Sequence, residues 1–119
     1  MKVLKRSECS ILDLVLKSKW FEMIESRDKL EEYRDYKPHW VIRLCNWDDC
    51  ADKRKPRVVE FRCGYSKSAP RVAFMAIQFK WRAIHQSFRF ATAPDHPEWG
   101  EPKGPHFVIE LGQRVILTD

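Results

Sequence analysis

Apolar and polar residues alternate along several stretches of the chain, a pattern typical of strands that bury one face. The pattern predicts strands over four ranges: residues 12–17, 57–65, 72–81 and 106–111. In the first range Leu12, Leu14 and Leu16 fall on one side. The third range is apolar on both faces, as a central strand is. The fourth range runs into Gly112, which predicts either a tight turn or a bulge.

Two short helices are predicted between the first two of these strands. Ser18 can serve as the N-cap of a helix over residues 19–26, in which Trp20 and Ile24 share one side. Pro38 suits the first turn of a second helix, which we expect to reach Cys45. The charged segment between them, residues 27–37, is predicted to be a turn followed by a short extended stretch.

Two segments are predicted to be loops, and each contains a tryptophan. The segment 46–56 is polar and holds Trp47, whereas residues 90–105 contain four of the seven prolines and hold Trp99. A long loop in a compact domain is usually functional or mobile. An indole in such a loop can stack on a nucleic-acid base or pack beneath the loop, and the sequence leaves both open.

Length and composition indicate one globular α+β domain. The chain has 119 residues, of which 44% are hydrophobic and 33% charged, as in globular proteins rather than disordered chains. It has no apolar run of the roughly 20 residues that a membrane span requires. The N-terminus lacks the apolar stretch of a signal peptide. We therefore expect a cytoplasmic protein that is not associated with a membrane.

The charge favours a polyanionic partner. The net charge is +5, which suits nucleic acid, although a protein can also be basic without binding one. The cysteines form no Cys-x-x-Cys pair, so we expect reduced thiols, no metal and no cofactor. These cysteines are Cys9, Cys45, Cys50 and Cys63.

The segment that begins at Lys29 carries the most specific candidate chemistry. If residues 30–34 are extended, Glu32 and Arg34 project to the same face and Tyr33 to the other, with Lys29 at the preceding turn. An arginine can grip a phosphate or a base edge, and a carboxylate can accept from an exocyclic amine or act as a general base. A solvated strand of mixed charge would show the same spacing.

This arrangement resembles the signature of the ASCH family, the activating-signal-cointegrator homology domains. The signature has the form Gly-x-Lys-x-x-Glu-x-Arg, and residues 27–34, Arg-Asp-Lys-Leu-Glu-Glu-Tyr-Arg, match it at Lys29, Glu32 and Arg34. Arg27 replaces the glycine, which suggests a reshaped turn because a residue with a Cβ disfavours positive φ. Similar segments extend over residues 12–117, including 14–24, 36–40, 61–65 and 107–112.

The resemblance implies a PUA-like fold, a small mixed β-barrel with short helices, and a pocket for RNA or a modified nucleoside. The ligand-binding residues that we expect are Lys17, Ser18, Trp20, Lys29, Glu32, Arg34 and Trp99.

Some ASCH proteins are similar to amidohydrolases that deacylate a cytosine derivative, which makes Lys29 and Glu32 candidate catalytic residues. In those proteins a threonine follows the lysine by three residues, and here Glu32 takes that position. The hydroxyl nucleophile is thus missing, although Glu32 could activate a water. The four histidines are scattered, and we expect them on the surface or in loops. Three functions remain open: RNA or nucleotide binding, hydrolysis of a modified nucleoside, and protein interaction through the aromatic loop.

Overall fold

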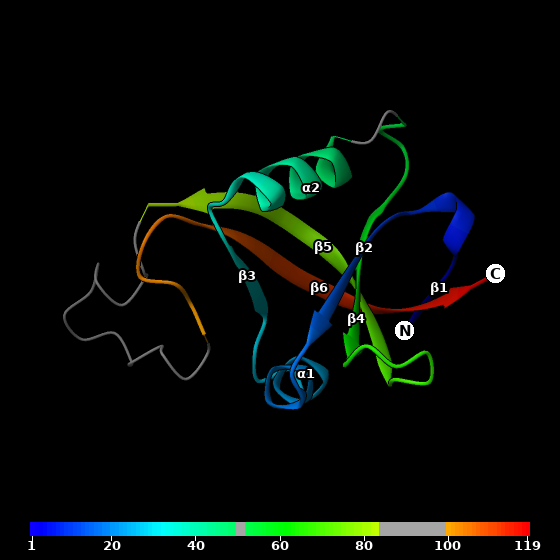
Figure 1. Ribbon diagram of the computed structural model, residues 1–119. Coiled ribbons are helices and arrows are strands. Elements are labelled where there is room, and N and C mark those ends of the chain that lie inside the picture. Colours follow the sequence, from blue (N-terminus) through cyan, green and yellow to red (C-terminus); the bar gives the residue numbers. More distant parts are fainter. Residues whose placement is uncertain (50–51, 84–99) are drawn as a thin grey trace.

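The computed structural model describes residues 1–49, 52–83 and 100–119, which form a mixed six-stranded sheet with two α-helices (Figure 1). A single turn of 3-10 helix, η1, follows the first strand. The elements in chain order are β1 (Lys2–Lys5), η1 (Arg6–Glu8), β2 (Ser10–Leu16), α1 (Ser18–Glu25), β3 (Glu31–Asp35), α2 (Pro38–Asp48), β4 (Arg57–Cys63), β5 (Arg71–Arg82) and β6 (His106–Thr118).

Strand β6 is the centre of the sheet. The strand order is β1-β6-β5-β4-β2, and β3 pairs with β6 off this path. Along one side β6 pairs antiparallel with β5, while on the other side its first half pairs with β3 and its last residues pair in parallel with β1. Within these ladders Glu32 lies opposite Ile109, and Lys2 lies opposite Val115.

The sheet does not close into the barrel that we expected. In the described part of the chain β2 pairs with β4 and β3 with β6, and no ladder joins β2 to β3. Side chains occupy the seam between these two edges instead. Arg43 of α2 donates to the carbonyl of Asp13 in β2, and Arg34 donates to the carbonyl of Tyr33 in β3 at 2.8 Å. Edge carbonyls that accept from arginines need no neighbouring strand.

The main core lies on the face of the sheet that the helices cover (Figure 1). The predicted alternation of β2 is confirmed, since Leu12, Leu14 and Leu16 are all buried there. A smaller cluster on the opposite face includes Cys9 and Val58, so β4 is covered on both sides. The main core is completed by Phe21, Ile24, Leu44, Trp47, Val59, Phe61, Val72, Phe74, Phe107, Ile109 and Leu111.

The helices differ from their predicted limits in ways that matter for the tryptophans. Lys17 rather than Ser18 is the N-cap of α1, and no side chain caps this end. Helix α2 begins at Pro38 as predicted but continues to Asp48. Trp47 is therefore buried in the core instead of lying in a loop, and its indole donates to the Ser10 carbonyl at 3.0 Å. Neither helix is long and apolar enough to cross a membrane.

Candidate functional site

The turn after α1 and the first residues of β3 bring three charged side chains together. The amide of Lys29 donates to the carbonyl of Met23 at 2.9 Å, which holds the turn against the helix. Glu32 Oε1 then lies 3.4 Å from Lys29 Nζ and 3.2 Å from Arg34 Nη1. One carboxylate oxygen of Glu32 thus contacts both Lys29 and Arg34. We call these three residues the triad. The spacing had placed Glu32 and Arg34 on a common face.

Arg27 makes this turn in the conformation that favours glycine. Its φ is +70°, in the left-handed region, where a Cβ is disfavoured. The guanidinium lies 4.7 Å from the centre of the Phe74 ring, a cation–π contact that offsets part of that cost. The turn at residue 27 thus has a positive φ, a conformation that glycine would adopt without this cost.

Burial dominates the electrostatics of the triad. Lys29 and Glu32 are only 3% and 2% exposed. Burial lowers the pKa of Lys29, because removing the ammonium from water outweighs its attraction to Glu32. The ammonium also lies 4.8 Å from the Trp20 ring and 5.3 Å from the Tyr33 ring. These contacts stabilise the charged form in a mainly aromatic environment.

One oxygen of Glu32 accepts no hydrogen bond in the described part of the chain. Oε1 has several donors, including the amide of Tyr33 at 2.8 Å, whereas Oε2 is buried without a partner. A buried acceptor left unsatisfied costs about 1–3 kcal/mol, and more when it is charged. Such an atom marks a position that an N–H or O–H donor of a ligand could fill.

The opposite face of β3 carries a second polar network, which sequence reasoning missed. Arg82 Nη2 donates to Glu31 at 2.9 Å and Arg82 Nη1 donates to Glu101, while the Tyr33 hydroxyl donates to Glu31 at 2.8 Å. Burial alone would lower the pKa of Arg82, but the hydrogen bonds to Glu31 and Glu101 outweigh burial and raise that pKa. Burial beside Glu31 raises the pKa of Tyr33. The hydrogen bond from Arg82 thus holds Glu101 against the sheet.

His106 belongs to the same network, so the expectation of a surface or loop histidine is wrong here. Its ring is fully buried, with Nδ1 2.7 Å from the Gly104 carbonyl and Nε2 3.0 Å from Glu101. A carbonyl oxygen can only accept, so Nδ1 is the donor in the contact with Gly104. The sequence offered one sign of this burial, because His106 begins an apolar strand. The pairing of β6 with β3 was not evident from the sequence.

A cavity of about 360 Å³ lies in the seam between β2 and β3, the two strands that do not pair. Three arginines come to it from three elements: Arg34 from β3, Arg43 from α2 and Arg62 from β4. We call it the arginine cavity, and of the triad only Arg34 lines it. The other lining residues are Asp13, Val15, His39, Trp40 and Tyr65.

The remaining predicted ligand-binding residues lie in several places. Trp20 is half-buried beside Lys29, and it also packs under Gly100, where an added Cβ would lie 3.2 Å from the indole. Lys17 and Ser18 are exposed at the start of α1, and in the described part of the chain neither makes a recorded contact with the triad. Trp99 lies outside the described residues.

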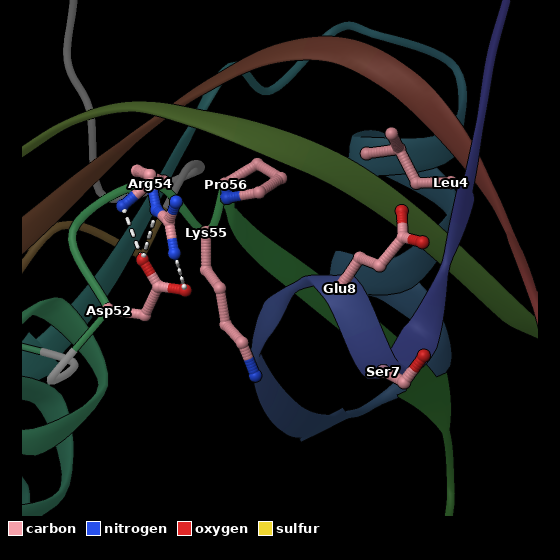
Figure 2. A pocket seen from close by; sticks show the side chains of 7 residues that line it. All are labelled: Leu4, Ser7, Glu8, Asp52, Arg54, Lys55 and Pro56. Atoms are coloured by element: carbon pink, nitrogen blue, oxygen red, sulfur yellow. Dashed lines mark hydrogen bonds and ion pairs between the residues drawn. The ribbon is translucent and has the colours of Figure 1, made fainter.

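Another hollow, of about 450 Å³, lies between η1 and the loop that holds Arg54 and Lys55. Figure 2 shows the side chains that line it. Asp52 pairs with Arg54 at 3.2 Å, and the Lys55 side chain extends towards η1 (Figure 2). The lining of this hollow contains both Glu8 and Asp52, so acidic groups balance the basic ones. This hollow has neither a buried charge nor a concentration of one sign, and we assign it no function.

Metal-ligand side chains do not cluster in the described ranges. Among residues 1–49, 52–83 and 100–119 no three His, Cys, Asp or Glu side chains converge as a metal site would require. Cys9 is buried, Cys45 is exposed and Cys63 is half-buried.

Comparisons with models of protein families, with curated proteins and with solved structures found no match for the chain.

Proposed function

We propose that the protein binds RNA or a nucleotide, with the triad recognising the polar edge of a base. The observation that carries this proposal is the buried, unsatisfied Oε2 of Glu32. The amino or ring N–H groups of bases are donors that a carboxylate can accept from. Arg34 connects the Glu32 carboxylate to the arginine cavity, because its guanidinium contacts Oε1 of Glu32 and also lines that cavity.

The finer fold assignment, a PUA-like ASCH domain, is part of the same proposal. It is supported by the match of Lys29, Glu32 and Arg34 to the signature and by the positive φ of Arg27 at the glycine position. The open seam between β2 and β3 departs from the barrel of that fold. The convergence of buried charges favours a ligand site over a protein-interaction domain that uses only aromatic residues.

Titration of short, fluorescently labelled single-stranded RNAs at two salt concentrations tests the binding proposal. We expect Glu32→Gln and Arg34→Ala each to weaken binding by about tenfold or more, since each removes a charge-assisted hydrogen bond. Arg54→Ala is the matched control for Arg34→Ala, because it removes the same positive charge from an exposed loop residue. Absence of binding at low salt, or equal losses in all three variants, would contradict recognition by the triad.

A second candidate, hydrolysis of a modified nucleoside, is favoured by one observation. Burial lowers the pKa of Lys29, which brings its amine closer to use as a base. The measurement is incubation with a panel of acylated nucleosides, followed by mass spectrometry. We expect turnover that Lys29→Met abolishes. If wild-type protein binds these nucleosides and leaves them unchanged, the binding function stands alone.

A further inference from the structure

The arginine cavity has an excess of positive charge. Its lining holds three arginines and a histidine against a single carboxylate, that of Asp13. Arg62 Nε pairs with this carboxylate at 3.2 Å. Arg34 has Glu32 as a counter-ion, but Arg43 has no carboxylate partner in the described part of the chain, since it donates to the carbonyl of Asp13. Among the described residues, at least one cation in the wall of the cavity therefore has no carboxylate beside it.

The guanidinium groups of the cavity are held in place before any ligand binds. Arg34 and Arg43 lie 5.0 Å and 5.4 Å from the centre of the Trp40 ring, so both contact the same indole. Backbone carbonyls of β3 and β2 accept from them as well. Fixed arginines lose little side-chain entropy on binding, and their planar fork fits the oxygens of a phosphate.

The size and aromatic lining of the cavity restrict its ligand. A volume of about 360 Å³ lies near the lower end of small-molecule sites, which suits one phosphate with its attached sugar and does not admit a duplex. Tyr65 is 85% exposed beside it. An exposed ring at the mouth of a basic cavity offers a surface on which a base can stack.

We propose that the arginine cavity is a phosphate subsite, which holds one phosphate of a nucleotide or of a single-stranded nucleic-acid backbone. Arg43 and Arg62 are its principal ligands, and Arg34 joins it to the triad. The subsite rests on its own contacts and does not require that the triad recognise a base.

NMR titration of the full chain with inorganic phosphate, against sodium chloride at equal ionic strength, tests the subsite. We expect saturable shifts of the Trp40 indole N–H and of the Nε–H signals of Arg43 and Arg62. Arg43→Gln and Arg62→Gln should each weaken phosphate binding about fivefold or more, whereas Arg54→Gln should not. Arg43→Lys retains the charge but loses the fork that stacks on Trp40, so it should also weaken binding. A spectrum of the unliganded variant confirms that each is folded.

Two further titrations separate this inference from the proposed function. Adenosine and the other nucleosides lack a phosphate, so Arg43→Gln should leave their binding unchanged while it weakens the binding of a nucleoside monophosphate. A nucleoside monophosphate that binds more tightly than a dinucleotide would identify a terminal phosphate as the ligand, and the reverse order would identify the backbone. Equal shifts with chloride, equal loss in Arg54→Gln, or poly-glutamate binding as tightly as phosphate would each overturn the subsite.

Discussion

Arg27 adopts a left-handed backbone conformation at the end of α1, and the chain tolerates this although the residue has a Cβ. Two effects oppose each other there. The conformation costs an L-residue roughly 1–2 kcal/mol, while the contact of the guanidinium with Phe74 returns about 0.5–1 kcal/mol, the usual range at an exposed site. The residue thus combines a backbone requirement and a side-chain contact that substitution can separate.

Paired substitutions of Arg27 measure these two effects. Arg27→Ala keeps the strain and removes the contact, so we expect a loss of about 0.5–1 kcal/mol in the free energy of unfolding. Arg27→Gly removes both, and we expect it to be more stable than the alanine variant by about 1 kcal/mol. Urea unfolding of the three proteins gives both differences. An alanine variant as stable as the glycine variant would show that the backbone there is unstrained.

At the residue scale, the sequence allowed the triad to be predicted but not its surroundings. Glu32 and Arg34 are two apart on a short strand, so their shared face follows from local geometry alone. The network of Glu31, Arg82 and His106 depends on β3 and β5 both pairing with β6, which no local pattern reveals. The arginine cavity was harder still to predict, because it forms between β2 and β3, two strands that do not pair.

Among the elements, β6 passes Gly112 without ending, so Gly112 does not form the tight turn that was one of the two alternatives predicted from the sequence. The pairing register of β5 and β6 shifts on both sides of Ala76, close to this glycine. A Cβ on Gly112 would lie 2.6 Å from Ile77 Cγ1, so the close approach of the two strands requires glycine there.

Substitution of Gly112 tests this close approach. Gly112→Ala should cost about 1–3 kcal/mol of stability through overpacking. Ile77 is exposed, so Ile77→Ala alone should change stability by no more than about 0.5 kcal/mol. The double variant should recover much of the loss, which thermal unfolding of all four proteins would reveal as a coupling energy. Additive effects would mean that the two residues do not collide.

Four of the six strands and both helices were predicted from their apolar patterns. In β2 the buried residues recur with period 2, whereas consecutive residues of β4 are buried because clusters cover both of its faces. The extended stretch of residues 31–35 was also predicted, as the segment after the turn. Strand β1 was missed, since in Lys2–Lys5 only Leu4 packs against the core. The end of α2 was misplaced because Asn46 and Asp48 have the polarity of a loop, whereas Trp47 between them is held in the core by tertiary packing.

For the molecule as a whole, Glu60 connects segments that are distant in sequence. It receives two hydrogen bonds from Arg6 of η1, at 3.0 Å and 2.7 Å, and one from Arg71 of β5 at 3.2 Å. Burial alone would raise the pKa of Glu60, but these two arginines outweigh burial and hold that pKa below its ordinary value. The ionised carboxylate therefore stabilises the folded chain.

The sign of the pH dependence follows from this lowered pKa. The stabilisation by Glu60 is present above the pKa of the unfolded chain, near 4.5, and is lost as the pH falls through the lower pKa of the folded state. Glu60→Gln should cost about 1.5–3 kcal/mol near neutral pH and progressively less in acid. Denaturant unfolding across this pH range measures the difference. Glu8→Gln, on the exposed side of η1, should follow the wild type; a loss for Glu60→Gln that is constant with pH would contradict the assignment.

The position of β6 has a consequence for biosynthesis. In the described part of the chain β1 and β3 have ladder partners only in β6, although β1 comes more than a hundred positions earlier in the sequence. A ribosome therefore completes β1 and β3 long before their partner exists, while β2, β4 and β5 can already pair among themselves. During that interval the Lys29 ammonium and the Glu32 carboxylate can remain hydrated. Their desolvation, and with it the assembly of the triad, is expected to be a late event that follows the emergence of residues 106–118 from the exit tunnel.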